Sequence, residues 1–308
     1  MKSILIKTLP YLIVFFVINI FIYKTSHFYN QEREYTTKID SVINNPKAKV
    51  IFLGDSHPKT IELLNLSENI GNLAFGADGI KEMYIKTMIS NKHIKELQYV
   101  FISTEPQMFN SSISSNSTFL NKYLINLDEY SKNIYKKTTL NLITEKAPFL
   151  NDNYILYFLN SIHSKINNLF KNKSSDNKNT KKWSELTENQ RKEQAIATGK
   201  FDHVAIMLNT DDLKLYKDLI NKLQSKNIKV IGIRFPVNSN YLEQCNKEDL
   251  RKVNTFINTL KLDYNLDYSL SIKDPSYYIN EDHLNKKGME KLSELIFNDT
   301  GINLNKKN

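Results

Sequence analysis

Short apolar runs in two parts of the chain, at about 49–109 and 205–300, predict buried β-strands. The runs 50–53 and 99–103 are almost entirely apolar, a pattern typical of strands that are covered on both faces. A third run, 70–79, predicts a strand that continues into a glycine-containing loop. Two further strands are predicted at 229–234 and near 266–268.

Segments with apolar residues near helical spacing separate these strands. The spacing is clearest for Ile80, Met83 and Tyr84. Helices are predicted near 80–90, 211–226, 249–261 and 286–297. Strands that alternate with helices favour right-handed crossovers and a mostly parallel sheet. We therefore expect a three-layer α/β domain over 49–300.

The strand–helix alternation stops between 110 and 200, where Ser, Asn, Tyr and Lys are frequent. Helical stretches are expected near 120–136 and 154–170, and 171–182 is a polar low-complexity loop. An insertion after the carboxyl end of a strand overhangs the edge of the sheet where ligands bind. We therefore expect a helical insertion over 110–200 that acts as a lid or selects the substrate.

An apolar segment at the amino terminus approaches the length of a membrane-spanning helix, about 20 residues. Lys2 and Lys7 precede its most apolar part, which favours a cytoplasmic amino terminus. No small-residue cleavage site follows the segment, so a cleaved signal peptide is only the alternative. We expect a signal anchor, a transmembrane helix, over 1–25 and a polar stalk over 26–48. The domain itself is expected to be membrane-anchored on the extracytoplasmic side of a bacterial cell envelope.

The composition excludes several classes of protein. Of the 308 residues, 24% are charged and 41% are hydrophobic, which are ordinary globular proportions. The formal net charge of +9 comes from lysines spread along the chain, without the basic patch that nucleic-acid binding needs. The single cysteine, Cys245, cannot form an internal disulfide, and no Cys/His spacing is typical of a metal site. We expect no nucleic-acid partner, no metal and no cofactor.

The candidate chemistry begins with Gly54-Asp55-Ser56-His57, directly after the run 50–53. Open α/β sheets bind ligands at their carboxyl edge, and a serine there becomes a nucleophile when a histidine takes its proton. A second histidine occurs much later, in Asp282-His283-Leu284-Asn285. Two alternatives stay open: Ser56 caps a following helix, and His57 is a loop residue that lines the cleft.

These two segments resemble the first and last sequence blocks of the SGNH (GDSL-type) hydrolase superfamily. They resemble most its membrane-anchored bacterial branch, near polysaccharide O-acetyltransferase-like and acetylesterase-like proteins. The segment 72–79, Asn-Leu-Ala-Phe-Gly-Ala-Asp-Gly, resembles the second block. The resemblance covers about 49–109 and 205–300. It implies an SGNH/flavodoxin-like parallel sheet, here with a helical insertion and a preceding transmembrane helix.

The resemblance also implies roles for single residues. Ser56 matches the nucleophile, and His283 matches the base. The backbone N–H of Ser56 and that of Gly76 or Ala77 match the oxyanion hole, which holds the negative oxygen of a tetrahedral intermediate. Asp55 is expected to hold the turn by hydrogen bonds.

Two departures from the family pattern concern the site. The family places an aspartate three residues before the histidine, where this chain has Asn280. Either Asn280 or the adjacent Asp282 is expected to orient His283. In the third block, Ser103-Thr104-Glu105-Pro106 replaces the usual Gly-x-Asn-Asp, and an ionised Glu105 cannot donate to an oxyanion. The expected cleft or substrate contacts are Asp55, His57, Asn72 and Glu105.

The expected function is that of an SGNH-like serine esterase or O-acyl(acetyl)transferase. Its partner would be an acylated carbohydrate, part of a cell-envelope or exported polysaccharide. Water as the acceptor gives an esterase and a sugar hydroxyl gives a transferase, and the residues do not separate the two. The alternative is a catalytically weak or inactive envelope protein of the same fold that binds glycan or an assembly partner.

Overall fold

The computed structural model describes residues 2–25, 27–109, 117–135, 159, 162–163, 182–202 and 208–306. The chain divides into two compact units. One unit comprises Met1–Thr37 and Thr118–Lys178, and the other comprises Lys38–Ser117 and Asn179–Asn308. The second unit contains the sheet and every predicted site residue.

Five parallel strands form one sheet in the order β2-β1-β3-β4-β5. This is the order of flavodoxin-like doubly wound folds, in which ligands bind where the strand order reverses, outside the carboxyl ends of β1 and β3. Phe52 of β1 lies opposite Asn72 on one side and opposite Phe101 on the other. The strands are β1 Val50–Leu53, β2 Ile70–Asn72, β3 Tyr99–Ser103, β4 Lys229–Arg234 and β5 Tyr264–Asp267.

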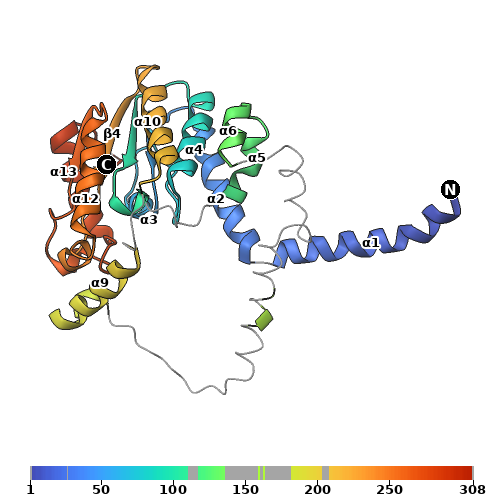
Figure 1. The fold of residues 1–308 in the computed structure, drawn as a ribbon, viewed down its shortest axis with the longest axis horizontal. Helices are drawn as coiled ribbons and strands as arrows, with labels where there is room; N and C mark the ends of the chain where they lie inside the picture. Colours follow the sequence, from blue (N-terminus) through green and yellow to red (C-terminus); the bar gives the residue numbers. More distant parts are fainter. Residues whose placement is uncertain are drawn as a thin grey trace, which may run out of the picture. The chain divides into compact units, whose positions relative to one another are not determined.

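Helices cover both faces of the sheet, which gives three layers. On one face α4 packs beside α10 (Figure 1), and α12 reaches α10 through the rings of Phe256 and Tyr216, 6.1 Å apart. On the other face α13 packs against η1. These elements are α4 Ile80–His93, α10 Thr210–Gln224, α12 Lys247–Thr259, α13 Lys286–Thr300 and η1 Thr60–Leu63.

The remaining described elements of this unit are shorter or lie at its periphery. Gly199 in α9 leaves no room for a side chain, because a Cβ there would lie 2.7 Å from the backbone oxygen of Tyr241 in α11. The elements are α3 Ser56–Lys59, η2 Pro106–Phe109, η5 Trp183–Glu185, α9 Glu188–Asp202, α11 Ser239–Leu242 and η6 Pro275–Tyr277.

The core between the sheet and α13 is aromatic and aliphatic. Phe52 and Phe101, on neighbouring strands, stack with their ring centroids 4.3 Å apart. Met289, Leu292 and Ile296 of α13 are fully buried in the same cluster. Burying one such side chain contributes about 1.5–3 kcal/mol, so this face of the sheet fixes α13 and the loop that precedes it.

The other unit contains α1 Lys2–Thr25, the first part of α2 His27–Ile43, η3 Ser117–Leu120, α5 Asn121–Leu124 and α6 Glu129–Ile134. The rings of Tyr35 and Phe119 lie 5.3 Å apart, and the Tyr123 hydroxyl donates to the backbone oxygen of Thr36 at 3.0 Å. Most of the expected insertion falls outside the described residues, so its role as a lid stays a prediction.

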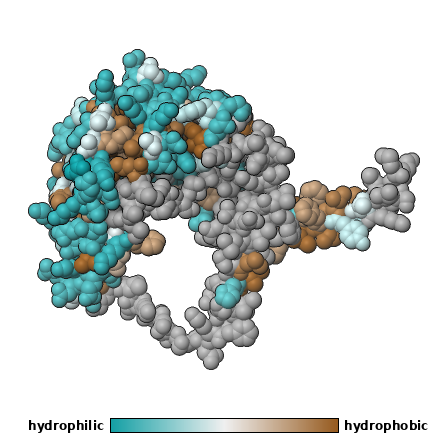
Figure 2. All heavy atoms as spheres, viewed as in Figure 1, coloured by the Kyte–Doolittle hydropathy of each residue, from teal (hydrophilic) through white to brown (hydrophobic). Residues whose placement is uncertain are grey.

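The amino-terminal helix α1 corrects one prediction. The apolar side chains described between Leu9 and Phe21 are exposed (Figure 2). However, Pro10 interrupts the run, and so does Asn19, whose amide donates to the Phe15 backbone oxygen. Of the helices that the structure describes, none is both long and apolar enough to cross a membrane. The predicted transmembrane helix and signal anchor over 1–25 are therefore wrong. The membrane-anchored, extracytoplasmic location that depended on them is withdrawn.

A buried ion pair fixes the loop between β2 and α4. The Lys86 ammonium binds the Asp78 carboxylate and the Leu73 backbone oxygen, and both charged side chains are buried. Burial lowers the pKa of Lys86, although Asp78 opposes that shift. At the start of α4, the Glu82 carboxylate accepts from the Gly79 N–H at 2.9 Å. The loop that carries Gly76 and Ala77 is thus anchored through its polar groups.

Removing only one partner of this ion pair should destabilise the fold strongly. Lys86→Met leaves Asp78 buried without its cation, and such a change costs about 3–5 kcal/mol. Urea unfolding should show a large drop in the midpoint with an unchanged slope. Replacing both partners, Lys86→Met with Asp78→Leu, should cost less than the single change. Lys95→Met, at an exposed position, is the control; equal midpoints for Lys86→Met and Lys95→Met would contradict the prediction.

Candidate active site

The turn after β1 requires a glycine. Gly54 has φ +144, and a Cβ there would lie 2.8 Å from the Ser103 Cβ and 2.7 Å from the Pro58 Cγ. Only glycine therefore allows the carboxyl ends of β1 and β3 to approach this closely. The next residue, Asp55, accepts from the His57 N–H at 3.1 Å and caps the short helix α3. This cap orients the His57 side chain at the carboxyl edge of the sheet.

His57 is buried between two carboxylates from distant parts of the chain. Its Nδ1 lies 2.5 Å from Glu105 Oε2, and its Nε2 lies 3.3 Å from Asp282 Oδ2. The imidazole is only 2% exposed. Glu105 is fixed in turn, since its Oε1 accepts from the Phe235 N–H at 3.0 Å. His57 thus joins β1, β3, β4 and the last loop.

Gln107 is a site residue that the sequence analysis did not identify. Its amide donates to Glu105 Oε2 at 2.6 Å and to Asp55 Oδ2 at 3.3 Å. It lies in η2, two residues after Glu105, and is buried. The one feature of the sequence that pointed to Gln107 as a site residue was its position in the segment after β3. Through these bonds Gln107 separates and satisfies two carboxylates that would otherwise repel each other.

The electrostatics favour a protonated His57. Burial by itself lowers the pKa of His57, but the charges of Glu105 and Asp55 outweigh it, and the pKa lies well above its ordinary value. Burial likewise opposes ionisation of Asp282, yet hydrogen bonds from His283 and His57 hold its pKa below the usual range. An imidazolium therefore stands between two carboxylates. Asp55 differs, because burial raises its pKa despite the nearby His57.

His283 has two neighbours on one ring nitrogen. Its Nδ1 lies 2.7 Å from Asp282 Oδ1 and 3.1 Å from Asn280 Oδ1. Asn280 also accepts from the His283 backbone N–H at 2.9 Å, which shapes the loop. The ring is 23% exposed, and its centroid lies 5.0 Å from that of His57. Both candidates for orienting the base therefore reach it.

Ser56 begins α3 and is partly exposed. Among the residues that the structure describes, no hydrogen bond joins the Ser56 hydroxyl to His283. The two belong to the same edge of the sheet, since the residue next to Ser56 contacts the residue next to His283. Hydrogen bonds of a catalytic pair are often long without substrate, so this geometry leaves the nucleophile role a prediction.

The loop after β2 is a tight turn. The Asp78 N–H donates to the Phe75 backbone oxygen at 3.1 Å, with Gly76 and Ala77 between them. Ala77 has φ +62, in the left-handed region. Asn72 holds this loop to α3, because its amide donates to the Pro58 backbone oxygen at 3.0 Å and its oxygen accepts from Ala74 N–H. An oxyanion role for Gly76 or Ala77 stays a prediction.

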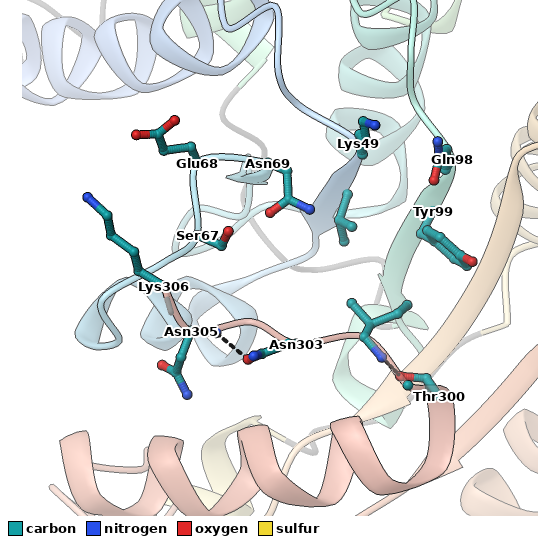
Figure 3. A pocket seen from close by; sticks show the side chains of 13 residues that line it. Lys49, Ser67, Glu68, Asn69, Gln98, Tyr99, Thr300, Asn303, Asn305 and Lys306 are labelled. Carbon is teal, nitrogen blue, oxygen red and sulfur yellow. Dashed lines mark hydrogen bonds between the residues drawn. The ribbon is translucent and has the colours of Figure 1, made fainter. Parts of the chain in front are cut away.

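Two of the cavities along this unit's sheet differ in their position relative to the cluster. One, of about 550 Å³, is lined by Lys49, Asn69 and Tyr99 among others (Figure 3). These residues lie at the amino ends of the strands, at the edge of the sheet opposite Ser56. None of the described residues that line it is a histidine. The other, of about 110 Å³, lies beside the cluster and is lined by Glu105, Gln107 and Phe235 together with apolar side chains of α11 and its neighbours. The smaller cavity contacts Glu105 and Gln107 of the cluster, but neither Ser56 nor His283 lines it.

The fold and the edge cluster define an α/β protein with a flavodoxin-like strand order and a histidine–carboxylate site. No protein-family model matches the chain, and no curated protein matches it significantly. Among solved structures, it is similar to a candidate platelet activating factor from Streptococcus pneumonia, at 10% identity and a TM-score of 0.42, over 88% of this chain and 92% of that one. It is also similar to a candidate acylhydrolase from Bacteroides fragilis, at 12% identity and a TM-score of 0.40, over 86% and 96%. Likenesses this distant do not assign an activity.

Replacing Ala77 by glycine should stabilise the protein. A side chain in the left-handed region costs about 1–2 kcal/mol, and glycine removes that cost at some expense in unfolded-state entropy. We expect a net gain of about 0.5–1 kcal/mol in chemical unfolding. Ala197→Gly, at an exposed position in α9, should instead lose about 1 kcal/mol. Loss of stability in both variants would contradict the turn geometry.

Proposed function

We propose that this protein is a serine-dependent acyl ester hydrolase or transferase, with Ser56 as nucleophile and His283 as general base. The observation that carries the proposal is the Asp282 carboxylate, which is buried and lies 2.7 Å from Nδ1 of the partly exposed His283. A carboxylate in this position holds the imidazole in one tautomer and stabilises the imidazolium that forms in acyl transfer.

In the proposed mechanism, Asp282 accepts a hydrogen bond from His283 Nδ1–H, which keeps that proton on Nδ1 and leaves Nε2 as a base. His283 Nε2 takes the Ser56 hydroxyl proton as Ser56 Oγ attacks the acyl carbonyl. The negative oxygen that develops is held by backbone N–H groups, with Ser56 and Gly76 or Ala77 as candidates. His283 then gives the proton to the leaving hydroxyl, and water or a sugar hydroxyl takes the acyl group from Ser56.

The buried network holds the Asp282 carboxylate in position to orient His283. His57 binds the second oxygen of Asp282 at 3.3 Å, while Glu105 binds the far side of the His57 ring. An ionised carboxylate without such partners would be costly at this depth. Asp282 is thus the better candidate for orienting His283, and Asn280 supports the loop from which His283 projects.

For the substrate, we propose an acetylated carbohydrate. The choice of acetyl as the acyl group rests on the resemblance of the sequence blocks, because Ser56 and His283 do not line the cavity of about 110 Å³ beside Glu105 and Gln107. The choice of carbohydrate rests on the resemblance of the sequence blocks. Glu105 has both carboxylate oxygens engaged, so contacts to sugar hydroxyls are expected from other residues of the edge.

A second candidate function is glycan binding without catalysis. The observation that favours it is the Ser56 hydroxyl, which makes no hydrogen bond to His283 in the part of the chain described here. On this reading, the edge cluster stabilises a binding surface, and Ser56 is only the first residue of α3, which Asp55 caps. Activity measurements on Ser56 distinguish the two candidates.

Ester hydrolysis should depend on Ser56. With p-nitrophenyl acetate, Ser56→Ala should lower kcat/KM by at least about 10³-fold, since the covalent route is lost. His283→Gln should have a similar effect. Ser225→Ala, which removes an exposed hydroxyl at the end of α10, is the matched control. Hydrolysis that persists unchanged in Ser56→Ala would exclude the proposed nucleophile.

The two candidates for orienting the base can be ranked by substitution. Asp282→Asn should lower kcat by about 10³–10⁴-fold, because the charge facing the imidazolium is lost. Asn280→Ala should lower kcat by less, about 10-fold or below, since it removes a neutral contact. Thermal unfolding of both variants serves to separate misfolding from catalysis. A larger loss in Asn280→Ala would assign the orienting role to Asn280.

A further inference from the structure

Two imidazoles face one carboxylate in the edge cluster. His57 Nε2 lies 3.3 Å from Asp282 Oδ2, and His283 Nδ1 lies 2.7 Å from Asp282 Oδ1. Donor atoms of all three residues lie within 4.8 Å of one another. We propose that His57, Asp282 and His283 form a binding site for a divalent first-row transition ion such as Zn²⁺. The site was hidden from the sequence analysis because His57 and Asp282 are far apart along the chain.

The spacing of the donors fits such an ion after a small movement. Zinc–nitrogen and zinc–oxygen bonds of about 2.0–2.2 Å in a tetrahedron place donor atoms roughly 3.3 Å apart. The contact from His57 to Asp282 already has that length. Since all three donor atoms lie within 4.8 Å of one another, no pair needs to approach by more than about 1.5 Å, which side-chain rotation of the partly exposed His283 can supply.

The donor types decide the class of ion. Two imidazole nitrogens and one carboxylate oxygen suit zinc, cobalt or iron(II) and do not suit calcium or magnesium, which prefer oxygen ligands. Three protein ligands also leave a fourth position open to solvent or substrate. The partial exposure of His283 places that open position toward the cleft.

Glu105 supplies an independent argument. Histidines that bind metal ions usually donate their other ring N–H to a carboxylate, which fixes the ring and raises its basicity. His57 has this arrangement, with Nδ1 at 2.5 Å from Glu105 and Nε2 directed at Asp282. Gln107 and the Phe235 N–H hold Glu105 in place. The fold therefore supplies the carboxylate partner, Glu105, that a metal-binding imidazole usually has.

The charges in the cluster are also compatible with a cation. Asp55, Glu105 and Asp282 are buried together with a single buried imidazole, that of His57. On binding, the ion replaces the protons that His57 Nε2 and His283 Nδ1 direct at Asp282, and these protons pass to solvent. The ion then supplies the positive charge that the protonated histidine supplied before.

The ion and the proposed esterase chemistry exclude each other. An ion on His283 Nδ1 leaves the remaining ring proton on Nε2, so His283 cannot take the proton of Ser56. Asp282 is then an ion ligand and no longer orients the base. This consequence rests on the proposed function, whereas binding of the ion does not. The ion would thus act as an inhibitor of the acyl-transfer reaction.

Binding is tested first, without reference to activity. The tag-free full-length chain is titrated with Co²⁺, followed by visible absorption, and with Zn²⁺, followed by calorimetry. We expect one ion per chain, with intense tetrahedral-type cobalt bands that Zn²⁺ abolishes. His57→Gln and Asp282→Asn should remove the bands. His93→Gln, an exposed histidine at the end of α4, should leave them unchanged.

Glu105→Gln is the more specific test, because it removes the supporting carboxylate without removing a ligand of the ion. Loss of such a supporting carboxylate lowers metal affinity by about 10–100-fold, so the bands should persist but require more Co²⁺. Absence of cobalt bands in the unaltered chain would overturn the proposal. Bands that are insensitive to both His57→Gln and Asp282→Asn would overturn it as well.

Inhibition is tested second, with p-nitrophenyl acetate. Zn²⁺ should suppress hydrolysis with the same affinity that calorimetry measures, and a chelator should restore it. Cobalt bands without any hydrolysis by the ion-free chain would support the metal site and contradict the proposed function. Hydrolysis without cobalt bands would support the proposed function and contradict the metal site. Failure of one proposal can therefore be distinguished from failure of the other.

Discussion

The burial of one imidazole between two carboxylates is the constraint on which this edge of the molecule depends. His57 follows β1, Glu105 follows β3, and Asp282 lies in the loop before α13, so the His57 imidazole joins three segments that are distant along the chain. A buried charge that loses its partner costs several kcal/mol. The ends of β1 and β3 and the last loop must therefore meet, and Gly54 makes that approach sterically possible.

The sheet was predictable where the apolar pattern was strong. The runs 50–53, 99–103 and 229–234 give β1, β3 and β4, because strands buried on both faces need continuous apolar side chains. The third run ends as a strand at Asn72, since the Asn72 side chain binds backbone groups and turns the chain into the loop. The prediction from the amino-terminal run was wrong, because hydropathy alone suggested a membrane-spanning helix that the structure does not support.

The site was only partly predictable. Ser56 and His283 stand in recognisable motifs, and the structure brings their segments to one edge. The contact between His57 and Asp282 is not encoded locally, because it depends on the closure of the whole sheet. Side chains of adjacent residues in a strand point to opposite sides, so Asp282 and His283 would not meet in an extended segment. The loop is instead turned by the bond from the His283 N–H to Asn280, and this places Asp282 and the His283 ring together.

The same geometry also limits what the site can do at one time. Asp282 has two oxygens, and in this structure each faces an imidazole nitrogen. With protons between them, the carboxylate orients His283 and leaves its Nε2 free to act as a base. With a metal ion between them, the same atoms become ligands and the base is lost. Under the two proposals, the occupant of the space around Asp282, protons or a cation, therefore decides whether the proposed acyl transfer can proceed.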